Sequence, residues 1–228
     1  MRIYTYLLIN FLSVLFPIIF SFHPKINFKK KFSVLIPSIL LTASFFIVWD
    51  IVFTQQGIWG FNPNYVSGIY FFNLPIEEIL FFICIPYASI FIYESLIVFE
   101  VIDHFKNIEN KITYTLIILC TCLAGLYYDK LYTSITFGLN ALFLTMYLSV
   151  VKHKFLSRFY FSYLIVLIPF FIVNGILTGT GVHEPIVWYN NTENLGIRLL
   201  TIPIEDMFYG MLMLMLSITF YEMKLKRF

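Results

Sequence analysis

The stretch Gly68-Ile69-Tyr70-Phe71-Phe72-Asn73-Leu74-Pro75-Ile76-Glu77-Glu78 returns 128 residues later as Gly196-Ile197-Arg198-Leu199-Leu200-Thr201-Ile202-Pro203-Ile204-Glu205-Asp206. Each copy ends in Pro-Ile followed by two acids, and each continues into an apolar, aromatic segment. The same offset relates Tyr93-Glu94 to Tyr221-Glu222. Because the register holds over the length of a helix, these stretches indicate an internal repeat.

The composition predicts an integral membrane protein. The 228 residues are 60% hydrophobic and only 12% charged, whereas soluble domains carry about 25% charged residues. No basic stripe with interleaved aromatic residues is present, so we do not expect a nucleic-acid partner. No glycine-rich nucleotide motif occurs and the histidines lack metal-ligand spacing, so we expect neither a cofactor nor a metal site.

Seven apolar windows approach the roughly 20 residues that a membrane-spanning helix needs. We therefore expect an all-α membrane protein with about seven transmembrane helices. The first window follows Arg2 and has no small-residue cleavage site after it, which favours a helix over a removed signal peptide. The predicted spans are 3–21, 32–53, 75–98, 112–128, 131–151, 159–178 and 200–222.

The distribution of Lys and Arg predicts how these spans are oriented. Basic residues in short loops favour the cytoplasmic side, and 12 of the 15 fall in alternate loops and the C-terminal tail. We expect the chain in the cell (cytoplasmic) membrane, with its N-terminus outside and its C-terminus in the cytoplasm. Loops 54–74 and 179–199 then lie outside, so both acidic motifs enter the membrane from that face.

The repeat and the seven spans together predict the domain organisation. Residues 1–100 form a first three-helix repeat, 101–130 carry a linking fourth helix, and 131–228 form a second repeat. One linking span lets both units keep the same direction, which predicts parallel repeats about an axis along the membrane normal.

The acidic pairs have a structural and a chemical interpretation. Proline and acids favour the first turn of a helix, so the pairs could simply start two helices. However, an ionised carboxylate at mid-membrane costs about 2.5–3.5 kcal/mol, and such groups usually face a cavity and carry function. Neighbours on a helix point about 100° apart, so one acid of each pair can face a shared cavity. We expect Glu77 and Glu205, identical in both copies, to be the primary pair, with Glu78 and Asp206 completing the catalytic set.

Carboxyl groups in an apolar, aromatic chamber suit acid–base chemistry without a redox step. Two acids that share a site differ in proton affinity, which leaves one protonated and one ionised, and aromatic faces stabilise a cation. For the aromatic loop residues, an interfacial belt is the alternative to a lid over the cavity. For the buried Asp and Asn, it is hydrogen bonding between helices. The residues that we expect to line the cavity are Asp50, Trp59, Phe61, Phe81, Phe82, Asn174, Trp188, Tyr189, Phe208 and Tyr209.

Glu94 and Glu222 are a second pair of repeated acids. Each lies 17 residues beyond the first acid of its motif, or roughly 25 Å along a helix. We therefore place them near the cytoplasmic interface.

These motifs resemble those of the small integral-membrane lycopene cyclases, whose two homologous units are separate subunits in some bacteria and fused elsewhere. The doubled Pro-x-Glu-Glu/Asp pattern is the most specific element of the resemblance, which covers nearly the whole chain. It is carried in the first unit by Trp49-Asp50, Gly57–Pro63, Leu74–Glu78 and Phe81-Phe82, and in the second by Asn174–Gly179, Trp188–Asn190, Thr201–Asp206 and Phe208–Gly210.

The resemblance implies ring closure at the ends of a linear carotenoid. A carboxylic acid protonates the terminal double bond, a neighbouring double bond attacks the cation, and proton loss gives a β-ionone ring. It thus implies a lycopene β-cyclase, an isomerase, with bilayer-dissolved lycopene as substrate and other enzymes of carotenoid biosynthesis as candidate partners. Three alternatives stay open: an ε-ring or C50 carotenoid cyclase, a non-catalytic carotenoid- or lipid-binding membrane protein, and a small transporter built on parallel repeats.

Overall fold

The computed structural model describes residues 2–150 and 155–225, and each predicted span in it corresponds to one helix. The seventh helix begins four residues later than expected because the residues before it form a hairpin. The helices are α1 (Thr5–Ser21), α2 (Phe32–Gln55), α3 (Ile76–Val98), α4 (Glu109–Leu126), α5 (Leu131–Val150), α6 (Leu156–Leu177) and α7 (Ile204–Leu225). Three short 3-10 helices, η1 (Arg2–Tyr4), η2 (Phe28–Lys31) and η3 (Pro63–Tyr65), lie in the connections.

The expected all-α membrane architecture is confirmed, although the number of spans is approximate. Within the described residues, five helical segments are long and apolar enough to cross a membrane: Phe28–Gln55, Ile76–Val98, Leu131–Ser149, Leu156–Leu177 and Ile204–Leu225. Helix α1 is apolar but has 17 residues, and α4 has 18 and carries Glu109 and Lys111 in its first turn.

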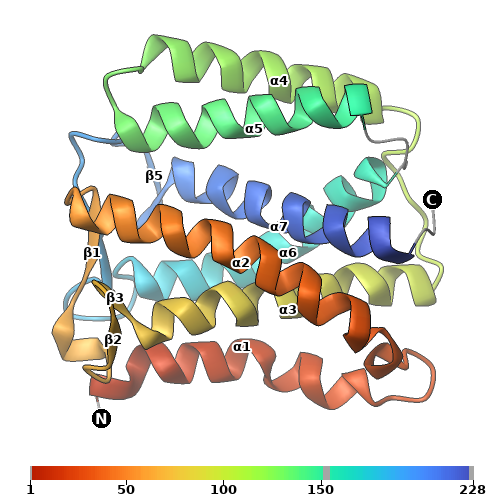
Figure 1. Cartoon of the computed structure of the whole chain (residues 1–228), viewed down its shortest axis with the longest axis horizontal. Helices are drawn as coiled ribbons and strands as arrows, with labels where there is room; N and C mark the ends of the chain where they lie inside the picture. The colour runs from red at the N-terminus through yellow and green to blue at the C-terminus, as the bar shows by residue number, and fades with distance from the viewer. Residues whose placement is uncertain (1, 151–154, 226–228) are drawn as a thin grey trace.

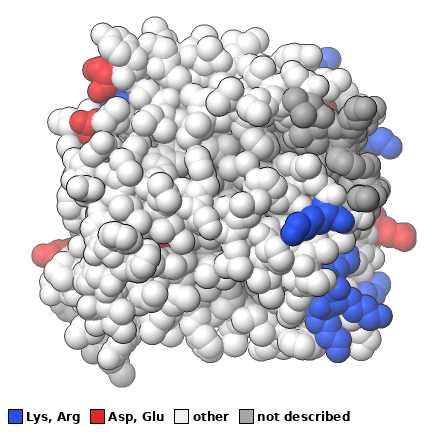
Figure 2. Space-filling model, viewed as in Figure 1, with Lys and Arg blue, Asp and Glu red and all other residues white. Residues whose placement is uncertain are grey.

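The helices run alongside one another, and the short strands gather at one end of the bundle (Figure 1). Helices α4 and α5 pack together on one side, and α1 packs against α3 on the other. Between them the two repeats interlock, because α2 packs on α7 of the second repeat while α6 packs on α3 of the first. Most of the Lys and Arg side chains visible in Figure 2 lie at the end opposite the strands. The predicted orientation in the membrane stays a prediction.

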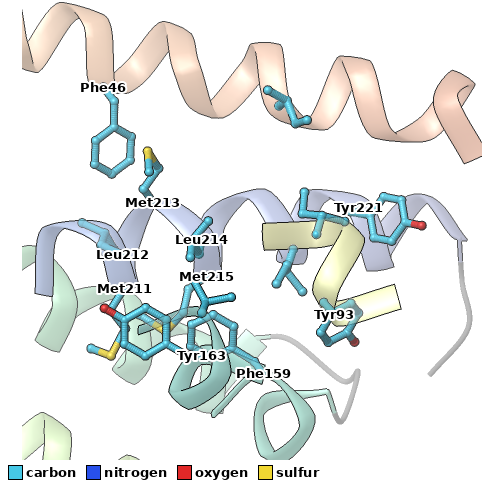
Figure 3. Packing of buried hydrophobic residues seen from close by; sticks show 14 of the residues in the cluster. Phe46, Tyr93, Phe159, Tyr163, Met211, Leu212, Met213, Leu214, Met215 and Tyr221 are labelled. Atoms are coloured by element: carbon cyan, nitrogen blue, oxygen red, sulfur yellow. The ribbon is translucent and has the colours of Figure 1, made fainter. Parts of the chain in front are cut away.

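Helix α7 lies at the centre of the bundle. Five consecutive side chains, Met211 to Met215, are each at most 4% exposed, and a helix that is apolar all round is buried on every side. Figure 3 shows Met213 pointing toward Phe46 of α2, whereas Met211 lies on the side of Tyr163 of α6. The rotation of α7 is therefore set by contacts around its whole circumference.

The loops that were expected to be irregular contain short strands. Each acidic motif is preceded by a hairpin, β2 (Tyr70–Phe71) with β3 (Leu74–Pro75) in the first repeat and β5 (Arg198–Leu199) with β6 (Ile202–Pro203) in the second. Their turns carry Phe72 and Leu200, both with positive φ (55° and 59°), although bulky residues rarely adopt that conformation. The offset of 128 residues thus relates backbone conformation as well as sequence.

A third strand pair joins the two repeats. Strand β1 (Trp59–Phe61) runs antiparallel to β4 (Val187–Tyr189), with Gly60 opposite Trp188. Because the offset of 128 maps β1 onto β4, this pairing maps onto itself. A two-fold axis that runs along the helices explains how repeats of the same direction meet through antiparallel strands.

The far ends of α3 and α7 obey the same symmetry. The Tyr93 hydroxyl donates to Glu222 at 2.9 Å, and the Tyr221 hydroxyl donates to Glu94 at 2.8 Å. Glu94 also forms an ion pair with Lys31. Both carboxyl groups are fully buried, so these acids link α3 and α7 inside the bundle and do not face an interface, as the sequence had suggested.

Candidate active site

One cavity lies between the two repeats, at the end of the bundle that holds the strands. It contains about 1080 Å³ of atom-free space, including the part that opens outward, which is on the scale of small-molecule sites of about 300–1,000 Å³. Its walls come from α1, α2, α3, α6 and α7 and from strands β1 and β4, and they are mostly apolar. Three carboxyl groups interrupt this surface: Asp50, Glu78 and Asp206.

The first acid of each pair holds the backbone and lies outside the cavity. A Glu77 side-chain oxygen accepts the backbone N–H of Ser67 at 2.8 Å, and Glu205 accepts that of Leu195 at 2.8 Å. Both acids are fully buried. They tie the segment before each hairpin to the first turn of α3 or α7. The expectation that Glu77 and Glu205 are the primary cavity pair is therefore wrong about their direction.

The second acid of each pair reaches the cavity, since it is rotated by about 100° from the first. The Tyr6 hydroxyl donates to Glu78. The Tyr132 hydroxyl donates to Asp206 at 2.6 Å, and that of Tyr189 donates to its other oxygen at 2.9 Å. Glu78 is 8% exposed and Asp206 4%, so both carboxyl groups are held in place by buried phenols.

The two tyrosines at the helix starts were missed by the sequence analysis. Tyr6 lies in the first turn of α1 and Tyr132 in the first turn of α5, so each begins the first helix of its repeat. Their equivalent positions were the available signal. Nothing in the local sequence, however, connects them to acids more than 70 residues away.

Tyr189 comes from β4, outside the spanning helices, and its environment keeps it a hydrogen-bond donor. Burial raises the pKa of Tyr189 well above its ordinary value, and the nearby Asp206 carboxylate raises it further. The phenol therefore stays protonated at neutral pH and continues to donate to Asp206.

Seven of the ten predicted lining residues border the cavity, and three do not. Those at the cavity are Asp50, Trp59, Phe61, Phe81, Asn174, Tyr189 and Tyr209. Phe82 is turned away and packs near Phe46, with ring centroids 6.1 Å apart. Phe208 packs on Phe137 at 4.6 Å and borders a separate apolar pocket. Trp188 is 43% exposed, and its indole covers Gly60. The helical rotation between adjacent aromatic residues accounts for the first two differences.

The described residues contain no group of three or more His, Cys, Asp or Glu side chains arranged to hold a metal ion. What the cavity does offer is carboxyl groups with phenol and indole donors, inside an aromatic wall. Such a site can add a proton to an apolar molecule and remove one from it.

The comparison with protein-family models matches residues 3–96 and 129–224 to the lycopene cyclase family. The two matched segments include both hairpins and both acidic pairs, and together they cover well over half of the chain. The chain belongs to the lycopene cyclase family. The comparisons with curated proteins and with solved structures find no match. This lycopene cyclase carries two matched segments in a single polypeptide, in agreement with the fused two-unit arrangement expected from its motifs.

Proposed function

We propose that this family member is a lycopene β-cyclase that closes a β-ionone ring at each end of lycopene. The observation that carries the proposal is the meeting of Glu78 and Asp206, from equivalent positions of the two repeats, in one apolar cavity. The family supports a carotenoid cyclase. The β-ring, the isomerase class and the role of each acid belong to the proposal.

Glu78 is proposed as the proton donor. It accepts one phenol hydrogen bond, whereas Asp206 accepts two, and hydrogen bonds to a carboxylate favour its ionised form. Asp206 then remains a carboxylate that faces the developing positive charge. Glu78 transfers its proton to the terminal double bond of the substrate, which leaves a tertiary cation on the adjacent carbon.

The ring forms within the substrate. A second double bond of the same molecule attacks the cation, so that one carbon–carbon bond closes a six-membered ring and the positive charge moves to a ring carbon. Loss of a proton from a neighbouring ring carbon restores a double bond. One proton enters and one leaves, so the product is an isomer of the substrate and no electrons are exchanged with the protein.

The shared cavity further supports successive reactions at the two ends of lycopene. Each repeat contributes one of the two tyrosine-bound acids to a single chamber. One end of lycopene therefore enters at a time, the monocyclic product γ-carotene leaves, and its second end enters for the next ring closure.

The test is expression of the chain in a lycopene-accumulating host, with the products separated by chromatography. The wild-type chain is expected to yield β-carotene, while Glu78→Gln and Asp206→Asn leave lycopene. Fully bicyclic product from both variants at the wild-type rate would contradict the mechanism. Lycopene that the wild-type chain binds but leaves unchanged would favour a non-catalytic carotenoid-binding protein, and ε-rings or larger products would identify another cyclase specificity.

A further inference from the structure

The cavity contains a third carboxyl group, that of Asp50 in α2. Asp50 is 2% exposed and lines the cavity. One of its oxygens accepts the indole N–H of Trp59. Its other oxygen, Oδ2, is buried and has no hydrogen-bond partner among the described residues. Leaving a buried polar atom without a partner is costly, and such sites call for an explanation.

The symmetry of the molecule does not provide that explanation. The run Phe45-Phe46-Ile47-Val48 precedes Trp49-Asp50 in α2, and Phe170-Phe171-Ile172-Val173 precedes Asn174-Gly175 in α6. Gly175 thus takes the place of Asp50 in the second repeat, and α6 has neither Asp nor Glu anywhere in its length. If Asp50 only stabilised the fold, an equivalent polar contact would be expected at the equivalent position of α6.

Asp50 is also close enough to Glu78 for their charges to interact. Two carboxyl groups that share an apolar site do not both ionise, so that one holds the proton and the other stays charged. Asp206 is already satisfied by two phenols. Glu78 and Asp50 therefore make up a donor and an acceptor within one half of the cavity.

We infer that Asp50 is a third catalytic carboxyl group, which removes the proton from the cyclised end group and so decides where the ring double bond forms. The inference rests on the proposed cyclase function. Once Glu78 has given its proton and the ring has closed, the Asp50 carboxylate takes a proton from a carbon next to the cationic centre. The electrons of that carbon–hydrogen bond become the ring double bond, and proton exchange between Asp50 and Glu78 or water restores the starting state.

The position of Asp50 relative to the bound end group then selects which proton is lost. Trp59 holds the carboxylate through its indole N–H, and its ring packs on Phe53 with centroids 4.9 Å apart. Trp59 is thus a positioning residue for Asp50, whereas Asp50 itself meets the substrate.

Asp50→Asn is the decisive variant, because the amide oxygen can still accept the Trp59 hydrogen bond but cannot take a proton. Membranes containing each variant are supplied with lycopene, protein amounts are matched, and product rate and ring type are determined by chromatography and NMR. We expect β-ring formation to fall by about 100-fold or more, the usual contribution of general base catalysis. Among the residual cyclic product, the share of ends with the double bond at another ring position should rise.

Asp129→Asn is the matched control, since it removes an exposed carboxyl group in the turn between α4 and α5. It should keep the wild-type rate and ring type. Trp59→Phe removes the positioning contact and should lower the rate less than Asp50→Asn does.

Two results would overturn the inference. One is a wild-type rate and ring type in Asp50→Asn. The other is an equal loss in Asp50→Asn and Trp59→Phe with the ring type unchanged, which would assign Asp50 a structural role. If the wild-type chain itself forms no cyclic product, the proposed function fails; if it forms product and Asp50→Asn matches it, only the role of Asp50 fails.

Discussion

In the first repeat Glu78 accepts a hydrogen bond from Tyr6, whereas in the second repeat Asp206 accepts hydrogen bonds from Tyr132 and Tyr189. The extra donor has a simple origin, because Tyr189 occupies the position that corresponds to Phe61, 128 residues earlier. Tyr209 corresponds in the same way to Phe81. The hydroxyl groups at these positions occur only in the second repeat, and the additional acid, Asp50, occurs only in the first.

The backbone-holding groups, by contrast, are the same in both repeats. Glu77 and Glu205 accept equivalent backbone N–H groups, the hairpins share their turn conformation, and β1 pairs with β4 about the two-fold axis. The repeats thus share a scaffold and differ in the polar groups at the cavity. This comparison indicates that duplication built the chamber and that sequence divergence made its two halves chemically different.

The largest expected effect comes from removing the acids that both repeats bring to the cavity. Glu78→Gln and Asp206→Asn should each lower cyclisation by about 100-fold or more, since proton transfer and stabilisation of the cation depend on them. Product formation by membranes of matched protein content, followed by chromatography, measures the loss. If either variant retained the wild-type rate, that acid would have no part in the reaction.

The contact where the repeats cross gives the next largest effect. A Cβ atom on Gly60 would lie 2.4 Å from Cζ2 of Trp188, so Gly60→Ala forces the indole to move. We expect a loss of about 1–3 kcal/mol of stability from overpacking, measured by denaturant unfolding in detergent. Combining Gly60→Ala with Trp188→Ala should cost less than the sum of the single changes, and strict additivity would contradict the proposed clash.

Exchanging the phenol between the repeats sharpens the comparison further. Tyr189→Phe removes one of the two donors to Asp206, and a hydrogen bond to a charged group contributes about 1.5–3 kcal/mol. The rate should fall by about tenfold. Phe61→Tyr should also slow the reaction, because a second phenol near Glu78 would favour its ionised form and weaken it as a proton donor. A faster Phe61→Tyr enzyme would contradict the assignment of Glu78 as the donor.

The smallest effect is expected at the first acid of each pair. Glu77→Gln and Glu205→Gln keep an oxygen that can accept the N–H of Ser67 or Leu195, so cyclisation should stay within about twofold of wild type. Alanine at either position leaves that N–H without its partner and should cost about 1–3 kcal/mol of stability. If Glu77→Gln lost activity as fully as Glu78→Gln, the division between holding and reacting acids would be wrong.

Much of the architecture could be predicted because it depends on composition and period. The apolar windows predicted the helices, and the offset of 128 residues predicted the repeat and the matching positions of the acids. Asp50, Tyr189 and Tyr209 were expected at the cavity and are found there. The hairpins were missed because their strands are only two residues long, which is too short for an alternating pattern to show.

The sequence by itself determined that two acidic pairs begin equivalent helices in an apolar bundle, and that neighbours in each pair point about 100° apart. Only the tertiary structure decided which acid of each pair meets the cavity. Helical periodicity sets relative directions, whereas the absolute rotation of α3 and α7 depends on packing and on the backbone N–H groups of Ser67 and Leu195. Those two groups bind Glu77 and Glu205, and Glu78 and Asp206 are thereby left facing the cavity.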